Sequence, residues 1–417
     1  MTDASAPQSS LLHHTGFSYF VIAFVARLPF AMMVVGVLTL AVSARQSLSL
    51  GGLTSAAVGL GTACFGPLLG AASDRFGQRA VLLIVGAANG IALALFAWIA
   101  YSPAPDAAML ACAFLIGATA PQVSPLSRSR LVTIIAEKMR GVRRDRVFNA
   151  TMAYESAADE TVFVIGPFVV GVLASFLAPW APLVAAAVIT VVFVSAFALH
   201  PTAPRRQTRS HDRPTGPVSQ LFRPTLLVVV VGILGVGLFF GSTLTGLTAF
   251  MDERGVPEQA GVLYGVMGIG SAAFALGVAF FPARFALAWR WVAFGGVILA
   301  GTIALPFVST IGQMAWALAL IGIGVGPTLV TQYSFGAERS PVGRSATVMT
   351  ILGSAVIVGQ SIGAAVTGEV AQRAGAQASL ILPAVSAGIV VLCAFANVVL
   401  SRRTSPTLLS TVPSARP

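Results

Sequence analysis

Long apolar segments alternate with short polar segments along almost the whole chain. Twelve of the apolar segments are long enough to cross a bilayer, because a helix needs about 20 apolar residues to span the hydrocarbon. The predicted spans are 17–44, 52–72, 80–102, 107–135, 147–176, 181–200, 224–251, 258–282, 288–308, 311–337, 342–370 and 377–400. The pattern therefore predicts an all-α integral membrane protein with twelve transmembrane helices.

One long polar segment divides these spans into six and six. It reads HPTAPRRQTRSHDRPTGPVSQLFRP at 200–224 and is rich in proline and arginine. We therefore expect two pseudo-symmetric halves, each a six-helix bundle. The expected units are an N-terminal tail at 1–16, a first bundle at 17–200, a linker at 201–223, a second bundle at 224–400 and a C-terminal tail at 401–417.

The two halves share weak internal similarity. GTACFGPLLGAASDRF at 61–76 aligns with GSAAFALGVAFFPARF at 270–285, and FLIGATAP at 114–121 resembles ALIGIGVGP at 319–327. A third match pairs 146–157 with 344–355. Helices rich in glycine and alanine match by chance, but three matches in the same order favour a true repeat. A repeat of six spans, with binding sites between the halves near the membrane midplane, is typical of transporters.

Composition agrees with the membrane interpretation and charge adds an orientation. The chain is 56% hydrophobic and only 9% charged, against about 25% charged in an average soluble domain. If the N-terminus is cytoplasmic, nearly all arginines fall in cytoplasmic segments, and only Arg45, Arg254 and Arg373 fall outside. This bias is the positive-inside rule. It explains the net charge of +11 without a nucleic-acid partner, and it predicts a multi-pass protein of the inner (plasma) membrane with both termini cytoplasmic.

The loop between the second and third spans carries a recognisable motif. GAASDRFGQRA at 70–80 resembles the cytoplasmic loop signature of the major facilitator superfamily, Gly-x-x-x-Asp-Arg-x-Gly-x-Arg. The matching residues are Gly70, Asp74, Arg75, Gly77 and Arg79. The resemblance implies the major facilitator fold and transport by alternating access. We expect the loop to act as an inner latch between the halves and not as a substrate site.

A second motif resembles the fifth-span element of the drug/proton antiporter branch. Gly166, Pro167 and Gly171 match it in IGPFVVG, whereas Val162 and Val170 stand where that branch has glycine. The resemblance implies close packing of the two halves and favours efflux over uptake. The arginine and glycine that the branch carries on span four are not matched, since this chain has PQVSPLSRSR at 121–130 instead.

Four ionisable residues lie deep in the predicted spans, namely Arg27, Glu155, Asp159 and Glu160. Glu155 and Asp159 are four residues apart and share one helix face, whereas Glu160 points about 100° away. Two carboxylates this close titrate as a coupled pair. Arg27 and Asp159 lie at similar depths, about 15 Å into their spans, so we predict an Arg27–Asp159 ion pair. Glu155 is shallower and matches the depth of Arg128 or Arg130.

Ionisable residues inside a membrane are usually functional and paired. We expect Asp159 to carry the coupling proton, with Glu155 as an inner relay and Glu160 as a substrate contact or a packing residue. A static structural network is the alternative. Candidates for a cavity or charge relay are Arg128, Arg130, Gln122, Gln332 and Tyr333, although polarity at helix ends accounts equally well for the last three.

The sequence contains no HExxH and no ATP-binding loop, and we predict no enzyme, no cofactor and no metal site. Energy then comes from an ion gradient or from the substrate itself. The preferred function is a monomeric secondary active transporter, a proton-coupled exporter of small amphipathic molecules. A proton-coupled transporter of a sugar, amino acid or organic acid, and a transporter-like sensor or scaffold, remain open.

Overall fold

The computed structural model describes residues 11–139, 141–203, 216–255, 260–282 and 284–404. Within these ranges, twelve helical spans, some of them made of two consecutive helices, are long and apolar enough to cross a membrane, which confirms the predicted number of spans. These helices cover Phe17–Arg45, Leu50–Phe76, Gln78–Tyr101, Asp106–Lys138, Arg144–Ala174, Ala181–Leu199, Pro224–Asp252, Leu263–Phe280, Leu287–Phe307, Ile311–Arg339, Ser345–Ala374 and Ala376–Ser401.

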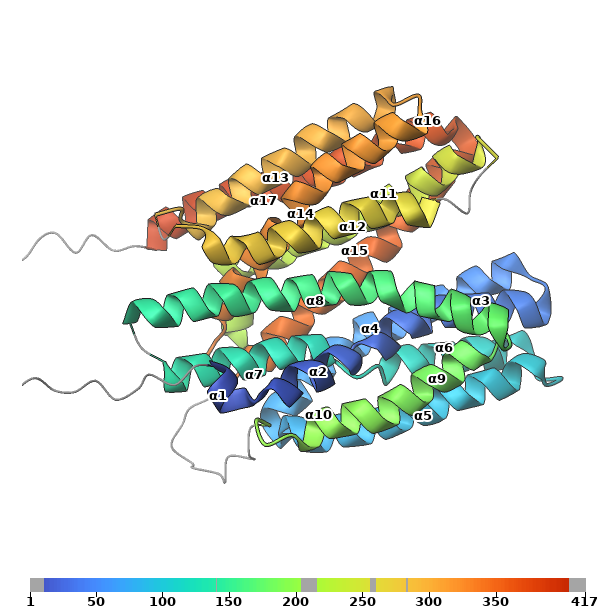
Figure 1. The fold of residues 1–417 in the computed structure, drawn as a ribbon, viewed down its shortest axis with the longest axis horizontal. Helices are drawn as coiled ribbons and strands as arrows, with labels where there is room; N and C mark the ends of the chain where they lie inside the picture. Colours follow the sequence, from blue (N-terminus) through green and yellow to red (C-terminus); the bar gives the residue numbers. More distant parts are fainter. Residues whose placement is uncertain (1–10, 140, 204–215, 256–259, 283, 405–417) are drawn as a thin grey trace, which may run out of the picture.

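The helices form two bundles that lie side by side (Figure 1). The first bundle contains α1 (Leu11–Thr15), α2 (Phe17–Val25), α3 (Leu28–Arg45), α4 (Leu48–Phe76), α5 (Gln78–Tyr101), α6 (Asp106–Ala118), α7 (Val123–Lys138), α8 (Gly141–Phe176), α9 (Ala181–Ile189) and α10 (Ser195–Leu199). The second contains α11 (Pro224–Asp252), α12 (Ala260–Gly277), α13 (Leu287–Ala304), α14 (Ile311–Arg339), α15 (Ser345–Ala374), α16 (Ala376–Ser379) and α17 (Leu382–Thr404).

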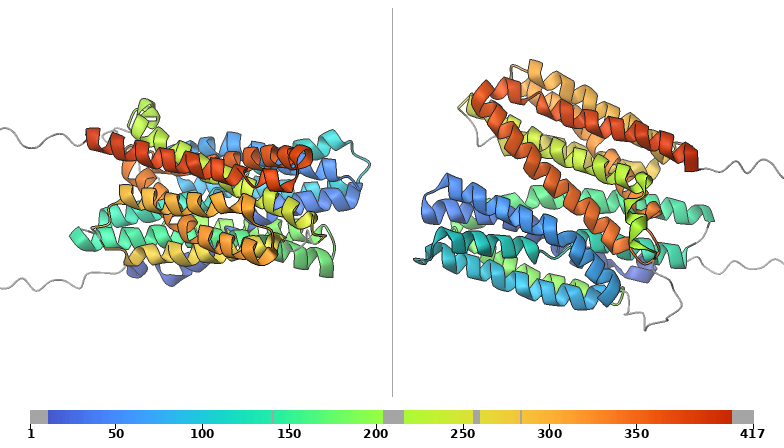
Figure 2. Two further views of the ribbon diagram at one scale, coloured as in Figure 1. Left: turned by 90° about the horizontal axis from the view of Figure 1, so that it is seen from above. Right: turned by 180° about the vertical axis from the view of Figure 1, so that it is seen from behind.

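Both described chain ends, Leu11 and Thr404, lie at the same end of the molecule, which we call the terminal end; the opposite end is the far end (Figure 1). The two bundles approach each other towards the terminal end and diverge towards the far end, as the view from behind also shows (Figure 2). The contacts between the two halves that are described below lie towards the terminal end.

Glycine contacts reveal the internal repeat in three dimensions. A methyl group added at Gly117 of α6 would lie 1.9 Å from the carbonyl oxygen of Val58 on α4. At Gly322 of α14 the added methyl would lie 2.5 Å from the carbonyl oxygen of Met267 on α12. The second match aligns Gly117 with Gly322, and Val58 and Met267 each lie three residues before the first match, at the same offset. Each half therefore packs its second span on its fourth through the same backbone contact.

Two sets of helices pack the halves against each other near the terminal end. Gly66 and Gly70 of α4 face Ser354 and Thr350 of α15, so closely that a methyl group at Gly70 would lie 2.0 Å from the Thr350 hydroxyl. α8 packs against α12, the short 3-10 turn Val278–Phe280 that follows it, and α14 through an apolar cluster, Met152, Ala153, Ala157, Ala275, Val278 and Val330. We call this α8–α12 contact, with its α14 residue, the seam.

Candidate functional site

A break in the first span places Arg27 inside the first bundle. α2 ends at Val25 and α3 begins at Leu28. Pro29 has no N–H to donate to the carbonyl of Val25, so the ARLPF sequence itself interrupts the helical hydrogen bonds. The Arg27 side chain leaves the chain at this break and is only 3% exposed.

A second break, in the fourth span, separates α6 from α7. Pro121 cannot donate to the carbonyl of Gly117, which instead accepts a hydrogen bond from the Thr62 hydroxyl at 3.2 Å. α7 then begins at Val123 and carries Ser124, Ser127 and Arg128 along one side.

The side chains from these two breaks meet two acids of α8. Arg27 Nη2 lies 2.5 Å from Glu155 Oε2, and Arg27 Nε lies 3.5 Å from Asp159 Oδ1. Arg128 Nη2 lies 2.7 Å from Asp159 Oδ2, which also accepts a hydrogen bond from the Ser124 hydroxyl at 2.6 Å. Glu155 is fully buried, whereas the Asp159 side chain is 20% exposed. We call Arg27, Arg128, Glu155 and Asp159 the charge cluster.

The predicted Arg27–Asp159 ion pair is present, but the expectation that Glu155 pairs with Arg128 or Arg130 is wrong, because Glu155 pairs with Arg27. Arg27 pairs more closely with Glu155 than with Asp159, and Asp159 pairs with Arg128. The helix break explains the difference. The depth of Arg27 is estimated by counting residues along a regular helix, and that count does not give the direction in which its side chain points.

Arg130 does not pair with these acids. Its guanidinium donates to Gln78 Oε1 at 3.2 Å, to the carbonyl of Phe197 at 3.0 Å and to the Thr202 hydroxyl at 3.2 Å. The Thr202 hydroxyl also lies 2.9 Å from Nδ1 of His200. Burial and the nearby Arg130 guanidinium lower the pKa of His200. Arg130 thus joins α5, α7 and α10 within the first bundle.

Hydroxyl groups that sequence reasoning missed complete the charge cluster. The Ser127 hydroxyl donates to Glu155 Oε1 at 3.0 Å, and Tyr19 Oη lies 2.8 Å from Ser127 Oγ. Both side chains are fully buried. A serine or tyrosine in an apolar span carries no charge to attract notice, and only its position beside an acid identifies it.

Glu160 has a different environment from its neighbour Asp159. It points across the seam, where its polar neighbours are Ser271 and Tyr264 of α12. Both carboxylate oxygens are buried and neither has a hydrogen-bond partner among the described residues. The arginines of the charge cluster are already bound to the other two acids.

Tyr333 of α14, in the second bundle, covers the charge cluster from the opposite side. The Tyr333 ring of α14 lies under Arg128, with its centroid 3.7 Å from the guanidinium carbon. Gln332 of α14 is fully buried, and neither atom of its amide has a described hydrogen-bond partner. Gln122 donates to the carbonyl of Ala120 at 3.0 Å. The structure therefore places Tyr333 against the cluster and gives Gln122 a local backbone partner.

The loop motif bridges the two halves at the terminal end. The Asp74 carboxylate accepts hydrogen bonds from the N–H groups of Ala346 and Thr347, at 3.2 and 2.8 Å, and from the Thr347 hydroxyl at 2.6 Å. It thereby caps α15, whose first-turn N–H groups have no partners within the helix. Gly77 adopts a φ of +90°, which favours glycine. Arg79 donates to the carbonyl of Leu199, and Arg75 lies over the exposed Phe76 ring.

The Gly-Pro element of α8 packs within one half. A methyl group at Gly166 would lie 2.5 Å from Cβ of Ala31 on α3, whereas one at Gly171 would meet nothing within 4 Å. The expectation that this element packs the two halves together is therefore wrong for Gly166 and Gly171. The side chain of Pro167 lies outside the described residues.

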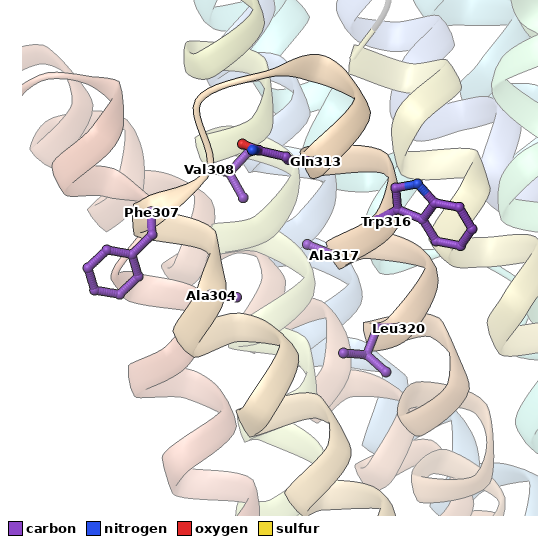
Figure 3. A pocket seen from close by; sticks show the side chains of 7 residues that line it. All are labelled: Ala304, Phe307, Val308, Gln313, Trp316, Ala317 and Leu320. Carbon is purple, nitrogen blue, oxygen red and sulfur yellow. The ribbon is translucent and has the colours of Figure 1, made fainter.

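Two surface pockets lie away from the charge cluster. One, of about 360 Å³, sits at the far end between α13 and α14 and is lined by Ala304, Phe307, Val308, Gln313, Trp316, Ala317 and Leu320 (Figure 3). Its Phe307 and Trp316 side chains are largely exposed. The other, of about 310 Å³, lies at the terminal end around Arg223 and Arg339.

Comparisons with known proteins agree on the fold. The sequence profile of the Major Facilitator Superfamily matches residues 16–356. Among solved structures, the human organic anion transporter MFSD10 (TETRAN) is similar with a TM-score of 0.67 and 18% identity, over 91% of this chain and 97% of that chain. The proton:xylose symporter XylE gives 0.68 and 15%, over 90% and 94%. The transporter FucP in the outward conformation gives 0.66 and 14%, over 91% and 99%. Among curated protein sequences, none matches significantly.

Proposed function

The chain belongs to the Major Facilitator Superfamily, and we propose that this membrane transporter exports small amphipathic molecules in exchange for protons. It is a multi-pass membrane protein and not an enzyme. Proton coupling, export and the substrate class are the proposed part.

The observation that carries the proposal is the charge cluster, which contains Glu155 and Asp159, together with the neighbouring acid Glu160. Acids are expensive inside a membrane and usually mark ion or proton pathways. These acids lie on α8, which contacts the second bundle at the seam, so any relative movement of the bundles changes their surroundings. A carboxylate that alternates between a closed and a wet environment binds a proton in one and releases it in the other.

The moving units in this proposal are residues 17–200 and 224–400, joined by the linker at 201–223. The terminal end faces the cytoplasm, because the arginines of the Asp74 loop lie there. With that orientation in the inner (plasma) membrane, the latch and the seam close the cytoplasmic side of the transporter. One chain supplies both halves of the site, which supports a monomer.

The preference for amphipathic substrates rests on what faces the charge cluster. The second bundle contributes the aromatic ring of Tyr333 there and no opposing acid or arginine among the described contacts. The partial Gly-Pro motif on α8 adds its resemblance to drug/proton antiporters in favour of export.

The test is transport in proteoliposomes that contain the purified protein. A pH gradient should drive fluorescent amphipathic compounds against their concentration gradient, and collapsing the gradient with a protonophore should stop it. If the pH gradient has no effect on the transport of any compound that binds, proton coupling is contradicted.

Transport of a polar metabolite is the second candidate. Gln332 offers a buried amide with no described partner, which suits a hydroxyl-bearing ligand if the second bundle opens around it. The similar structures include a xylose symporter by its printed name. Inhibition of amphipathic transport by sugars, amino acids or organic acids, tested one class at a time, separates the two candidates.

A further inference from the structure

Glu160 stands outside the charge balance of the charge cluster. Arg27 and Arg128 carry two positive charges, which the carboxylates of Glu155 and Asp159 match at distances of 2.5 to 3.5 Å. Glu160 adds a third acid, and both arginines of the charge cluster are already paired with the other two. The charged groups that act on it are the adjacent Asp159 and Arg128, and Arg128 is already bound to Asp159.

The seam closes around the Glu160 carboxylate. Both oxygens are shielded from solvent, and neither receives a hydrogen bond from the described residues. From α12 it faces Ser271 and Tyr264, which are uncharged, and the apolar cluster of the seam includes Ala157 one turn before it on α8. A carboxylate in such a place takes up a proton instead of remaining charged, because an unpaired buried charge is very costly.

The position of this acid ties its proton to a movement. Its surroundings come from both halves, since α8 belongs to the first bundle and α12 to the second. Parting of α8 from α12 wets the carboxylate and lets it ionise, whereas Asp159 and Glu155 keep their arginines within the first bundle in either state.

We propose that Glu160 is the acid that carries the coupling proton, and that it binds one proton each time the seam closes. This inference rests on the proposed proton coupling and replaces Asp159, the acid expected from the sequence, as the carrier. The proton reaches Glu160 from the far side while the seam is closed and leaves to the terminal side when the seam opens there, so each cycle carries one proton from the far side to the terminal side. Asp159 and Glu155 then hold the two arginines and position α8.

Proton binding at Glu160 makes the equilibrium between the seam-open and seam-closed states depend on pH. A proton bound only by the seam-closed state shifts the equilibrium between the two states about tenfold per pH unit, over the range in which the wet carboxylate ionises. Low pH favours the closed seam and the open far end. Replacing Glu160 by glutamine, which cannot ionise, removes this dependence and keeps the seam closed.

The experiment measures the separation of the bundles at the far end. Nitroxide labels are attached at Ala107→Cys and Ser309→Cys in a chain whose native cysteines are replaced. Pulsed electron paramagnetic resonance then measures the distance between the two labels from about pH 5 to about pH 9. We expect the long-distance population to fall with rising pH in the otherwise native chain and to stay high and constant with Glu160→Gln. Glu137→Gln, the same change at an exposed acid of α7, should behave like the native chain. Gel filtration checks that each variant is folded.

Transport in the same proteoliposomes separates the two hypotheses. A Glu160→Gln protein should lose transport driven by a pH gradient but keep exchange of labelled for unlabelled substrate. If it still follows the pH gradient, or if its far-end distances keep the native pH dependence, Glu160 is not the carrier. If the native chain ignores the pH gradient while its distances depend on Glu160, the proposed proton coupling fails and the Glu160 proton site stands.

Discussion

At the scale of single residues, Arg27 shows how a membrane-buried cation is held. Its guanidinium bridges Glu155 and Asp159 of the same helix face, at 2.5 and 3.5 Å. Asp159 has a second partner in Arg128, whereas the partners of Glu155 among the described residues are Arg27 and the Ser127 hydroxyl. Glu155 therefore depends on Arg27 more than Asp159 does.

This difference predicts the outcome of removing Arg27. Arg27→Ala leaves Glu155 as an uncompensated buried charge, and we expect a loss of about 3–5 kcal/mol in the free energy of unfolding. Adding Glu155→Ala should restore much of the thermal stability measured in detergent. Arg373→Ala, which removes an exposed arginine, serves as the control and should change little. A double variant no more stable than Arg27→Ala alone would show that Glu155 is not the dependent partner.

The sequence predicts which residues matter here better than how they pair. Acids and arginines stand out in an apolar span, so Arg27, Glu155, Asp159 and Glu160 could be selected from their depth alone. Their pairing depends on the break before Pro29 and on rotation about the helix axis. Arg128 and Arg130, two residues apart, point about 200° apart on α7, so only one of them faces α8. The hydroxyl partners Ser127 and Tyr19 have no signal in the sequence.

At the scale of elements, the equivalent helix pairs of the two halves are built differently. α3 and α8 meet through the arginine and acids of the charge cluster and through Gly166. α11 and α15 meet backbone to backbone, because a methyl group at Gly241 would lie 2.0 Å from the carbonyl oxygen of Gln360. Small residues allow such close contact between helices in a membrane. The first helix pair is held together by ion pairs, and the second by close packing of the two backbones.

Shape-based packing predicts a strong response to one methyl group. Gly241→Ala forces α11 away from α15, and we expect a loss of about 1–3 kcal/mol in the free energy of unfolding. Gly296→Ala on α13 is the matched control, since its added methyl would meet nothing within 4 Å. The control should be neutral or stabilising by about 0.5–1 kcal/mol. Thermal unfolding in detergent compares the two, and equal effects would contradict the close crossing.

At the scale of the whole molecule, the bond between Asp74 and α15 connects the two halves. Hydrogen bonds to charged groups contribute about 1.5–3 kcal/mol, so Asp74→Asn should alter the balance between states and reduce turnover about tenfold. Substrate affinity should be largely unchanged, because the charge cluster is elsewhere. Asp252→Asn, at the far end of α11, is the control. An unchanged turnover with a large loss of affinity would contradict a latch.

The membrane orientation predicts which end reagents reach from outside. Ser219→Cys lies at the terminal end and Ser309→Cys at the far end, and both positions are exposed. In intact cells carrying a chain without native cysteines, a membrane-impermeant thiol reagent should label position 309 and not position 219. Labelling of position 219 from outside would reverse the assigned orientation.

The cap on α15 has a further consequence, which concerns water. When Asp74 leaves, the N–H groups of Ala346 and Thr347 lose their acceptors, and water has to replace them. Opening of the terminal end therefore draws water into the molecule there. Solutes too large to follow that water oppose the opening, in the way that excluded osmolytes favour compact states of proteins. Lower water activity therefore favours the state in which Asp74 caps α15. In a cell dehydrated by a concentrated medium, a larger fraction of the transporter molecules is in that latched state.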